Sequence, residues 1–240
     1  MKRRIRMVAG PNGSGKTTLV SYLRTAYSLP LGYCLNPDEL EREILQAGGI
    51  NFAPWGLQVD EVNLRAFLDA HPLAARTELG DFKMEGNDLR VERHVPGGYL
   101  ASILSDYLRR RWLDAGISFT FETVMSSRDK LDLIRDAGKR GYRTYLYYIC
   151  TNSALINEER VASRVRKGGH DVPKSKILAR YDRSLDLLAE CIRLTDRAYL
   201  FDNSEESHRP VAEFESGRLV TLYSPPPAWF VRAWPDLQAP

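Results

Sequence analysis

The sequence predicts an α/β fold in which a mostly parallel five-stranded sheet is flanked by helices. Two observations lead to this expectation. Short apolar runs alternate along the chain with longer segments whose apolar residues recur at helical spacing, and the first apolar run leads through a glycine-rich loop into the first helical segment. The chain has 240 residues, of which 43% are hydrophobic and 27% are charged, so it can form a core of normal size.

Each short apolar run has the length of one buried strand and is followed by a turn signal or a polar residue. The five predicted strands cover residues 5–9, 33–35, 117–122, 142–150 and 197–201. The predicted helices cover residues 17–27, 38–46, 97–115, 127–140, 153–167 and 174–194. Because strands and helices alternate, we expect the helices to cover both faces of the sheet.

Two regions do not follow this alternation. Residues 47–96 contain a glycine pair and several prolines, and we interpret them as an inserted, largely helical cap within a single domain over residues 1–240. Residues 205–240 predict a C-terminal hairpin followed by an aromatic tail. The tail either packs on its own domain or forms an interface, and the sequence leaves both alternatives open.

Composition excludes several classes of protein. A net charge of +3 and a pI near 8.7 suit a protein that handles phosphates but do not indicate nucleic-acid binding. The three cysteines show no CxxC spacing, so we expect neither a disulfide framework nor a zinc site, and a reducing cytoplasm is the natural compartment. No apolar run approaches ~20 residues and the N-terminus lacks a signal-peptide apolar region, so we expect no membrane association.

The glycine-rich loop is the most specific motif in the chain. Its sequence GPNGSGKT fits the pattern GxxxxGK[ST], follows a predicted strand and opens a predicted helix, which is the context of a phosphate-binding loop. Lys16 is expected to reach the β- and γ-phosphates of ATP, and Thr17 to ligate Mg²⁺ through its hydroxyl. We therefore assign ATP binding to Gly10, Pro11, Asn12, Gly13, Ser14, Gly15, Lys16, Thr17 and Thr18.

Carboxylates follow two of the predicted strands, where open α/β sheets bind their ligands. Asp38 lies after the second strand and could accept the proton of an attacking hydroxyl, or could instead cap the helix that begins there. Glu122 and Thr123 end the third strand and could hold substrate hydroxyls or a Mg²⁺-bound water. For Glu122 the alternative is a structural salt bridge.

Basic residues crowd the end of the helix predicted over residues 153–167 and precede a glycine pair and His170. Arginines on a mobile lid can neutralise the charge of a transferring phosphoryl group. The candidates are Arg160, Arg164 and Arg166, with Arg180 on the next helix able to point back. The alternative is a solvated basic helix end that the helix dipole stabilises.

Five motifs occur in one order along the chain: GPNGSGKTT, NPDEL, FETVMSS, RVRKGGHDVP with RYDRSL, and FDNS. In this combination the chain closely resembles the zeta-toxin family over residues 4–45 and 97–204. Zeta toxins are similar to the adenylate-kinase-like group of P-loop kinases. Those of known activity phosphorylate UDP-N-acetylglucosamine at the sugar 3′-hydroxyl, so the resemblance implies an ATP-dependent phosphotransferase with an alcohol acceptor and an antitoxin partner that covers the ATP site.

The resemblance implies a role for each motif. Asp38 would be the catalytic base and would contact the acceptor together with Glu122 and Thr123. Asn203, with Ser204, would lie near the adenine. ATP and Mg²⁺ would be bound by Lys16 and Thr17, and the phosphates by arginines among Arg160, Arg164 and Arg166.

One departure from the family concerns the acceptor site. The founding toxins carry an arginine shortly after a Glu-x-Thr element, whereas here Glu122 and Thr123 are adjacent and two serines occupy the later region. A kinase for another small acceptor, such as a nucleoside, dinucleotide or antibiotic, is therefore an alternative. A further alternative is an ATP-hydrolysing switch in which Glu122 orients water. The arginine lid and Asp38 favour transfer over switching.

Overall fold

The computed structural model describes residues 2–76, 82–91, 97–169, 171–223 and 225–234. The chain divides into two compact units. The first comprises Met1–Gly32 and Thr120–Pro240, and the second comprises Tyr33–Phe119. The glycine-rich loop, Glu122 and the predicted arginine lid therefore belong to the first unit, and Asp38 belongs to the second.

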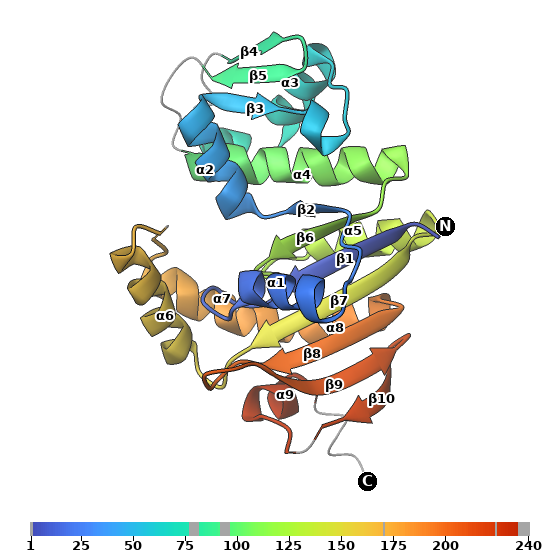
Figure 1. Ribbon diagram of the computed structural model, residues 1–240, viewed down its shortest axis with the longest axis vertical. Coiled ribbons are helices and arrows are strands. Elements are labelled where there is room, and N and C mark those ends of the chain that lie inside the picture. Colours follow the sequence, from blue (N-terminus) through green and yellow to red (C-terminus); the bar gives the residue numbers. More distant parts are fainter. Residues whose placement is uncertain (1, 77–81, 92–96, 170, 224, 235–240) are drawn as a thin grey trace. The chain divides into compact units, whose positions relative to one another are not determined.

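A seven-stranded sheet forms the centre of the fold (Figure 1). In spatial order its strands are β10 (Arg218–Leu222), β9 (Arg209–Glu215), β8 (Arg197–Asp202), β7 (Arg143–Cys150), β1 (Arg4–Ala9), β6 (Phe119–Thr123) and β2 (Tyr33–Leu35). The pairs β1–β7 and β7–β8 are parallel, and the pairs β8–β9 and β9–β10 are antiparallel. The predicted α/β fold with a mostly parallel sheet is confirmed, but the predicted number of five strands is wrong.

The two additional strands are those of the predicted C-terminal hairpin. β9 and β10 pair with each other, as expected, but β9 also pairs along β8 from Arg197 opposite Glu215 to Asp202 opposite Arg209. The hairpin therefore extends the central sheet instead of folding apart from it. This pairing satisfies the backbone groups of β8 that would otherwise form an open sheet edge.

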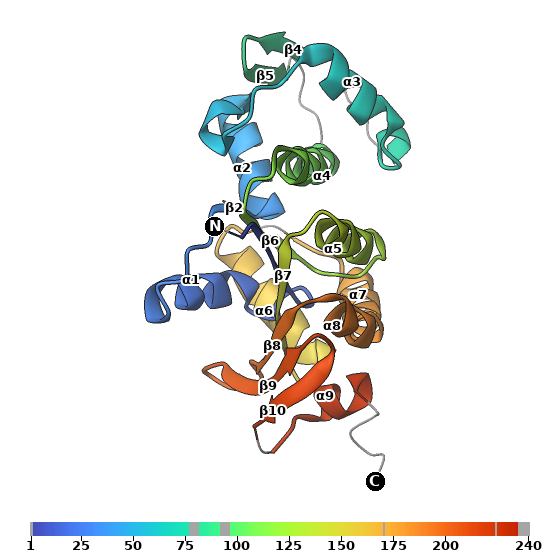
Figure 2. The same ribbon diagram turned by 90° about the vertical axis from the view of Figure 1, so that its right-hand side faces the viewer.

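Helices cover both faces of this sheet, as predicted. In the first unit they are α1 (Lys16–Ala26), α5 (Asp129–Lys139), α6 (Ala154–Arg166), α7 (Lys174–Asp186), α8 (Leu188–Leu194) and α9 (Ala228–Ala233). Figure 2 shows α1 on one side of the strands and α5, α7, α8 and α9 on the other. The helix predicted over residues 174–194 is divided at Leu187 into α7 and α8. None of the described helices has the length and apolar character needed to cross a membrane.

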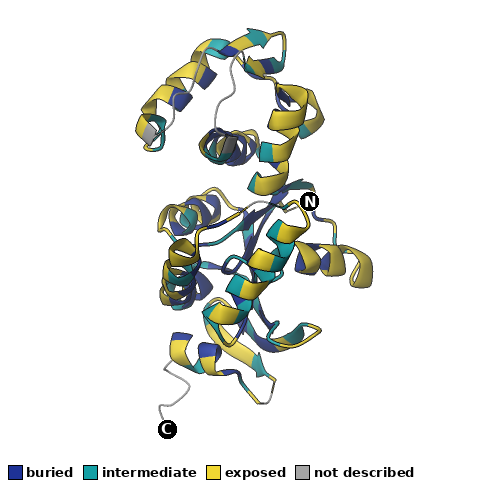
Figure 3. Ribbon diagram, turned by 90° about the vertical axis from the view of Figure 1, so that its left-hand side faces the viewer, coloured by how far each residue is buried: buried dark blue, intermediate teal, exposed yellow. Residues whose placement is uncertain are grey.

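The core of the first unit lies along the strands. Ile5, Met7 and Val8 of β1 are fully buried, and Figure 3 shows buried residues along the strands with exposed residues on the outer sides of the helices. Burial of one such side chain contributes about 1.5–3 kcal/mol. The loop that follows β1 is therefore held on a rigid base.

The aromatic tail packs on its own unit, which decides between the two alternatives for it within the described residues. Trp229 and Phe230 of α9 are 2% and 0% exposed. The ring of Trp229 lies 5.8 Å from that of Tyr148 on β7, and Trp234 lies 4.8 Å from Phe214 on β9. The tail thus completes the core beneath the added hairpin.

The second unit contains a small sheet that the sequence analysis did not predict. Its elements are α2 (Pro37–Ala47), β3 (Gly49–Asn51), a 3₁₀ turn (Ala53–Trp55), α3 (Glu61–Ala70), a second 3₁₀ turn (Ala74–Arg76), β4 (Phe82–Glu85), β5 (Asp88–Val91) and α4 (Gly97–Ala115). The strands pair antiparallel in the order β3-β5-β4. The predicted cap over residues 47–96 falls within this unit, and it is a mixture of strands and helices.

Aromatic residues build the core of the second unit. Trp112 of α4 is fully buried and stacks on Tyr33 with ring centroids 5.5 Å apart. Its indole N–H donates to the carbonyl of Trp55 at 2.8 Å. A buried tryptophan with a satisfied N–H is a packing residue.

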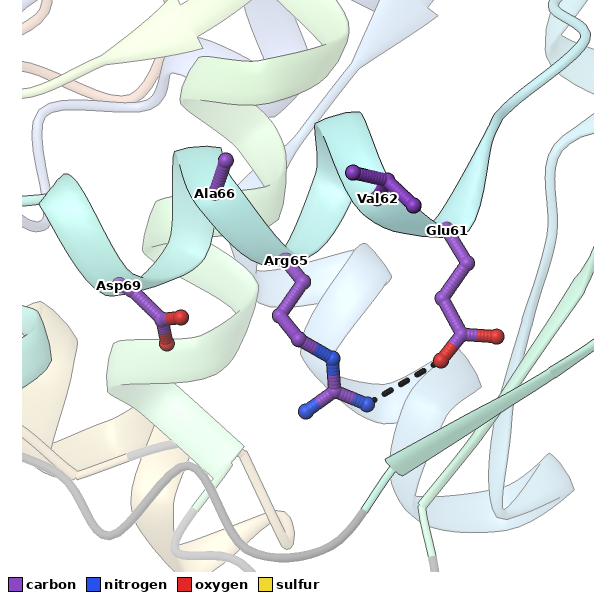
Figure 4. A pocket seen from close by; sticks show the side chains of 5 residues that line it. All are labelled: Glu61, Val62, Arg65, Ala66 and Asp69. Carbon is purple, nitrogen blue, oxygen red and sulfur yellow. Dashed lines mark hydrogen bonds and ion pairs between the residues drawn. The ribbon is translucent and has the colours of Figure 1, made fainter.

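A pocket of about 440 Å³ lies against α3 (Figure 4). It is lined by Glu61, Val62, Arg65, Ala66 and Asp69. Arg65 and Glu61 form an exposed ion pair at 3.2 Å, of a kind that contributes little to stability. None of these residues belongs to a predicted motif.

The cysteines provide a test of the core. Cys150 and Cys191 are fully buried, whereas Cys34 is partly exposed. Burial raises the pKa of the Cys150 thiol to about 12 and raises the pKa of Cys191 above its ordinary value. Because the thiolate is the reactive form, we expect one of the three thiols to react with Ellman's reagent in the native protein and all three after unfolding. Rapid modification of Cys150 in the native protein, located by mass spectrometry, would contradict this core.

Candidate nucleotide-binding site

The loop between β1 and α1 requires glycine. Gly10, Gly13 and Gly15 have φ angles of 152°, 76° and 98°, which side chains rarely tolerate. A β-carbon on Gly10 would also collide with the carbonyl oxygen of Ile149. Among the described residues no side chain caps the N-terminus of α1, so the N–H groups of its first turn can point to an anion.

Lys16 folds back over this loop. Its Nζ donates to the carbonyl oxygens of Gly10 and Pro11, each at 2.9 Å. These bonds hold the ammonium group within the curl of the loop, where a phosphate oxygen could replace a carbonyl oxygen as acceptor. The predicted contact of Lys16 with the β- and γ-phosphates stays a prediction.

A threonine–carboxylate pair lies next to the loop. The Oγ1 of Thr17 donates to Oε2 of Glu122 at 3.0 Å. Glu122 is 5% exposed and lies near the end of β6. A hydroxyl and a carboxylate supply the oxygen donors that Mg²⁺ prefers, so this pair fits a magnesium ion bound with the nucleotide.

Thr123 has a different set of contacts from Glu122. Its Oγ1 accepts from the backbone N–H of Met125 at 3.1 Å, and its carbonyl oxygen accepts from the N–H of Gly10 at 3.2 Å. Thr123 therefore links the turn after β6 to the glycine loop. Its predicted contact with an acceptor stays a prediction.

Asn203 supports the loop from the side of β8. Its Nδ2 donates to the carbonyl oxygen of Ser14 at 2.8 Å, and a β-carbon on Gly15 would collide with this amide. Arg160 of α6 donates to the carbonyl oxygens of Asn203 at 2.7 Å and Glu205 at 3.0 Å. Arg160 therefore holds the turn after β8, and its predicted contact with ATP stays a prediction.

The predicted arginine lid corresponds to the end of α6. Arg164 is partly buried and Arg166 is exposed. Gly168 has φ of 83° and Gly169 donates its N–H to the carbonyl of Arg164 at 3.0 Å, which ends the helix. His170 lies outside the described residues.

Asp38 lies in the first turn of α2. The cap of this helix is Asn36, whose side chain accepts from the N–H of Asp38 at 2.9 Å. The alternative that Asp38 caps the helix is therefore wrong. Asp38 is exposed, and its predicted role as a base stays a prediction.

Comparison with known proteins tests the resemblance that the motifs predicted. A family model described as Zeta toxin matches residues 100–208. Over this segment the chain is similar to the zeta toxin family. The match contains Glu122 and the arginines of α6, and it confirms the resemblance for the C-terminal group of motifs.

Two further comparisons match a short part of the chain and most of its length, respectively. A Haemophilus influenzae protein described as uncharacterized is 31% identical over 65 residues, which are 27% of this chain and 46% of that protein. The crystal structure of AvrRxo1-ORF1 with AvrRxo1-ORF2 and ATP matches with a TM-score of 0.57 and 15% identity, over 92% of this chain and 60% of the matched chain. The same pair with sulphate ions matches with a TM-score of 0.56 and 14% identity, over 92% of this chain and 61% of the matched chain.

The structural matches have low sequence identity, and all of the matches cover part of the other protein. At 14–15% identity the structural match shows the shared fold alone. The chain spans about 60% of the matched AvrRxo1 chain and 46% of its Haemophilus influenzae relative. The match agrees with the α/β fold predicted from the sequence.

Two further residues contact the glycine loop: Arg180, which the sequence analysis named as able to point back, and Asn157, which it did not assign to the site. Arg180 of α7 donates to the Oδ1 of Asn12 over a long 3.5 Å. Asn157 of α6 is fully buried, and its carbonyl lies so close to Gly13 that a β-carbon there would be 2.5 Å away. The available signal for Asn157 was its position four residues before the buried Val161 on the same helix face.

Proposed function

We propose that the chain is an ATP- and Mg²⁺-dependent phosphotransferase of zeta-toxin type. The observation that carries the proposal is the Thr17–Glu122 contact of 3.0 Å beside a glycine loop in which Lys16 is already held. Bound Mg²⁺ would neutralise charge on the β- and γ-phosphate oxygens. The family match over residues 100–208 and the shared fold of a protein crystallised with ATP support the same assignment.

We propose an alcohol acceptor, with UDP-N-acetylglucosamine as the leading candidate because of the family resemblance. In the proposed step the acceptor hydroxyl oxygen forms a bond to the γ-phosphorus while the bond to the β-phosphate oxygen breaks and ADP leaves. The hydroxyl proton passes to the carboxylate of Asp38. Arg164 and Arg166 would offset the charge on the transferring group, with their guanidinium groups as donors.

An antitoxin partner is proposed on the same basis. The matched AvrRxo1 structures are complexes of ORF1 with ORF2, and the resemblance to zeta toxins implies a protein that covers the ATP site. For this chain, a bound antitoxin should compete with ATP for the glycine loop. Protection of the loop amides from hydrogen exchange by a co-expressed partner tests this proposal.

The test of the base uses two neighbouring acids of one helix turn. Asp38→Asn is expected to lower the rate of phosphoryl transfer by about a hundredfold or more, because it removes the proton acceptor. Glu39→Gln is the matched control, since Asp38 and Glu39 are both acidic residues of the first turn of α2, where a carboxylate interacts favourably with the helix dipole. The control should retain most of the activity.

Purified protein with Mg-ATP would be incubated with nucleotide sugars, nucleosides and dinucleotides, and products read by mass spectrometry. A phosphorylated UDP-N-acetylglucosamine that is lost in Asp38→Asn but kept in Glu39→Gln supports the zeta-type kinase. Phosphorylation of another compound would identify a different acceptor and would still support the function as a kinase. Equal losses in the two variants would remove Asp38 from the role of base.

A slow ATPase switch is the second candidate, and the position of Glu122 favours it. A buried carboxylate next to Thr17 could orient an attacking water molecule instead of contributing to a Mg²⁺ site. This candidate predicts ADP release without any phosphorylated acceptor, at a rate that Asp38→Asn does not change. The same product analysis therefore separates the two functions.

A further inference from the structure

A buried carboxylate joins the last helix to the turn after β8. Asp202 ends β8 and is 3% exposed. Its Oδ1 accepts from the indole N–H of Trp229 at 2.9 Å and from the hydroxyl of Ser204 at 2.8 Å. Its Oδ2 lies 3.6 Å from Nε of Arg209. A buried charge is stable only when such partners surround it.

From Asp202 the hydrogen bonds continue to the glycine loop. Ser204, which donates to Asp202, accepts from the backbone N–H of Asn152 at 2.8 Å. Asn203, the residue between them, donates its backbone N–H to Cys150 at 2.8 Å and its side-chain amide to the carbonyl of Ser14 at 2.8 Å. The conformation of residues 202–204 thus determines where the Asn203 amide meets the loop.

Trp229 lies on α9, at the other end of this series of hydrogen bonds, and the packing of α9 holds it in place. Its side chain is 2% exposed, with its ring 5.8 Å from that of Tyr148. On the outer side of α9, Arg232 donates to Asp182 of α7 at 2.8 Å. The indole N–H therefore approaches Asp202 from a fixed direction.

We propose that Asp202 and Trp229 are positioning residues of the nucleotide site, through which α9 sets the geometry of residues 202–204 and the affinity for nucleotide. The proposal rests on the proposed function for the identity of the nucleotide. Neither residue is a catalytic residue, because each acts on the loop through Asn203.

The two buried tryptophans of the tail give a matched pair of variants. Trp229→Phe keeps a large ring but removes the N–H, which leaves Asp202 without one of its donors. Trp234→Phe also replaces a buried indole, but Trp234 packs on Phe214 at 4.8 Å and on Arg193 at 5.0 Å. Both variants should lose a similar amount of packing, and only Trp229→Phe should disturb the turn.

The first measurement is hydrogen exchange in the protein without nucleotide. In Trp229→Phe, amides of residues 202–205 should exchange about fivefold faster than in the wild type, the factor expected for one lost hydrogen bond. Trp234→Phe should leave them unchanged. Unchanged exchange in Trp229→Phe overturns the proposal, whatever the nucleotide proves to be.

The second measurement is the Kd for ATP by calorimetry. Trp229→Phe should weaken ATP binding about fivefold while kcat at saturating ATP stays near the wild-type value. If both variants lose the same ATP affinity, and the loss parallels the fall in their melting temperatures, the Trp229–Asp202 hydrogen bond contributes to stability alone. That result would overturn the proposal. If the wild type binds no ATP, the proposed function is wrong. The exchange experiment would still test whether α9 sets the conformation of residues 202–204.

Discussion

Replacing Lys16 with methionine is expected to lower the rate of phosphoryl transfer by about a thousandfold. The charge of the γ-phosphoryl group is spread over its oxygens in the transition state of phosphoryl transfer, and the ammonium group of Lys16 would stabilise that charge from within the glycine loop. The structure already holds Nζ 2.9 Å from the carbonyl oxygens of Gly10 and Pro11. Methionine keeps the length of the side chain and removes the charge. The initial rate at saturating Mg-ATP measures the loss.

The variant should stay folded, because methionine keeps the length of the side chain and the bonds that Lys16 donates to Gly10 and Pro11 lie within its own loop. Lys167→Met is the control, since Lys167 is an exposed lysine that follows α6. A melting temperature close to that of the wild type, together with near-normal activity of the control, assigns the loss to Lys16. A Lys16→Met variant that retains most of its activity would refute the role of the loop in transfer.

The glycine loop was predictable because all of its determinants are local. A buried strand, three glycines with positive φ, a lysine and a helix N-terminus follow one another without a gap. Each residue type is required by backbone conformation or by charge at its own position. The same holds for the alternation of strands and helices, which depends on the period of apolar residues.

The two strands beyond the predicted five depend instead on pairing between distant segments. The hairpin of β9 and β10 was predicted, but its pairing with β8 follows from contacts such as Ala198 opposite Phe214. The sheet of the second unit also consists of strands of three or four residues. Such short strands show too little alternation to be separated from loops.

Arg160 shows why the role of a site residue is harder to predict than its position. The sequence places it on the helix that carries the other candidate arginines, and the structure confirms that helix. Its guanidinium nevertheless donates to the carbonyls of Asn203 and Glu205. An arginine near a phosphate site can hold protein backbone as well as ligand, and spacing along one helix cannot distinguish these roles.

The sequence leaves several roles open for Glu122, and the structure favours one of them. Its position after a strand allowed contact with the acceptor, with Mg²⁺-bound water or with a structural partner. The contact with Thr17 at 3.0 Å favours a role of Glu122 in the binding of Mg²⁺. Glu122→Gln keeps the shape and removes the charge, so we expect the Mg²⁺ concentration at half-maximal ATP binding to rise about tenfold to a hundredfold. The KM for the acceptor should change little.

A double-mutant cycle sharpens this prediction. Thr17→Val removes the hydroxyl that donates to Glu122, and each single variant should weaken Mg²⁺-dependent ATP binding. Because both residues would serve one ion, the double variant should lose less than the sum of the two single losses. Glu205→Gln is the control for the loss of one negative charge, since Glu205 is exposed in the same unit. Additive losses, or a rise in acceptor KM at unchanged Mg²⁺ requirement, would instead place Glu122 in the acceptor site.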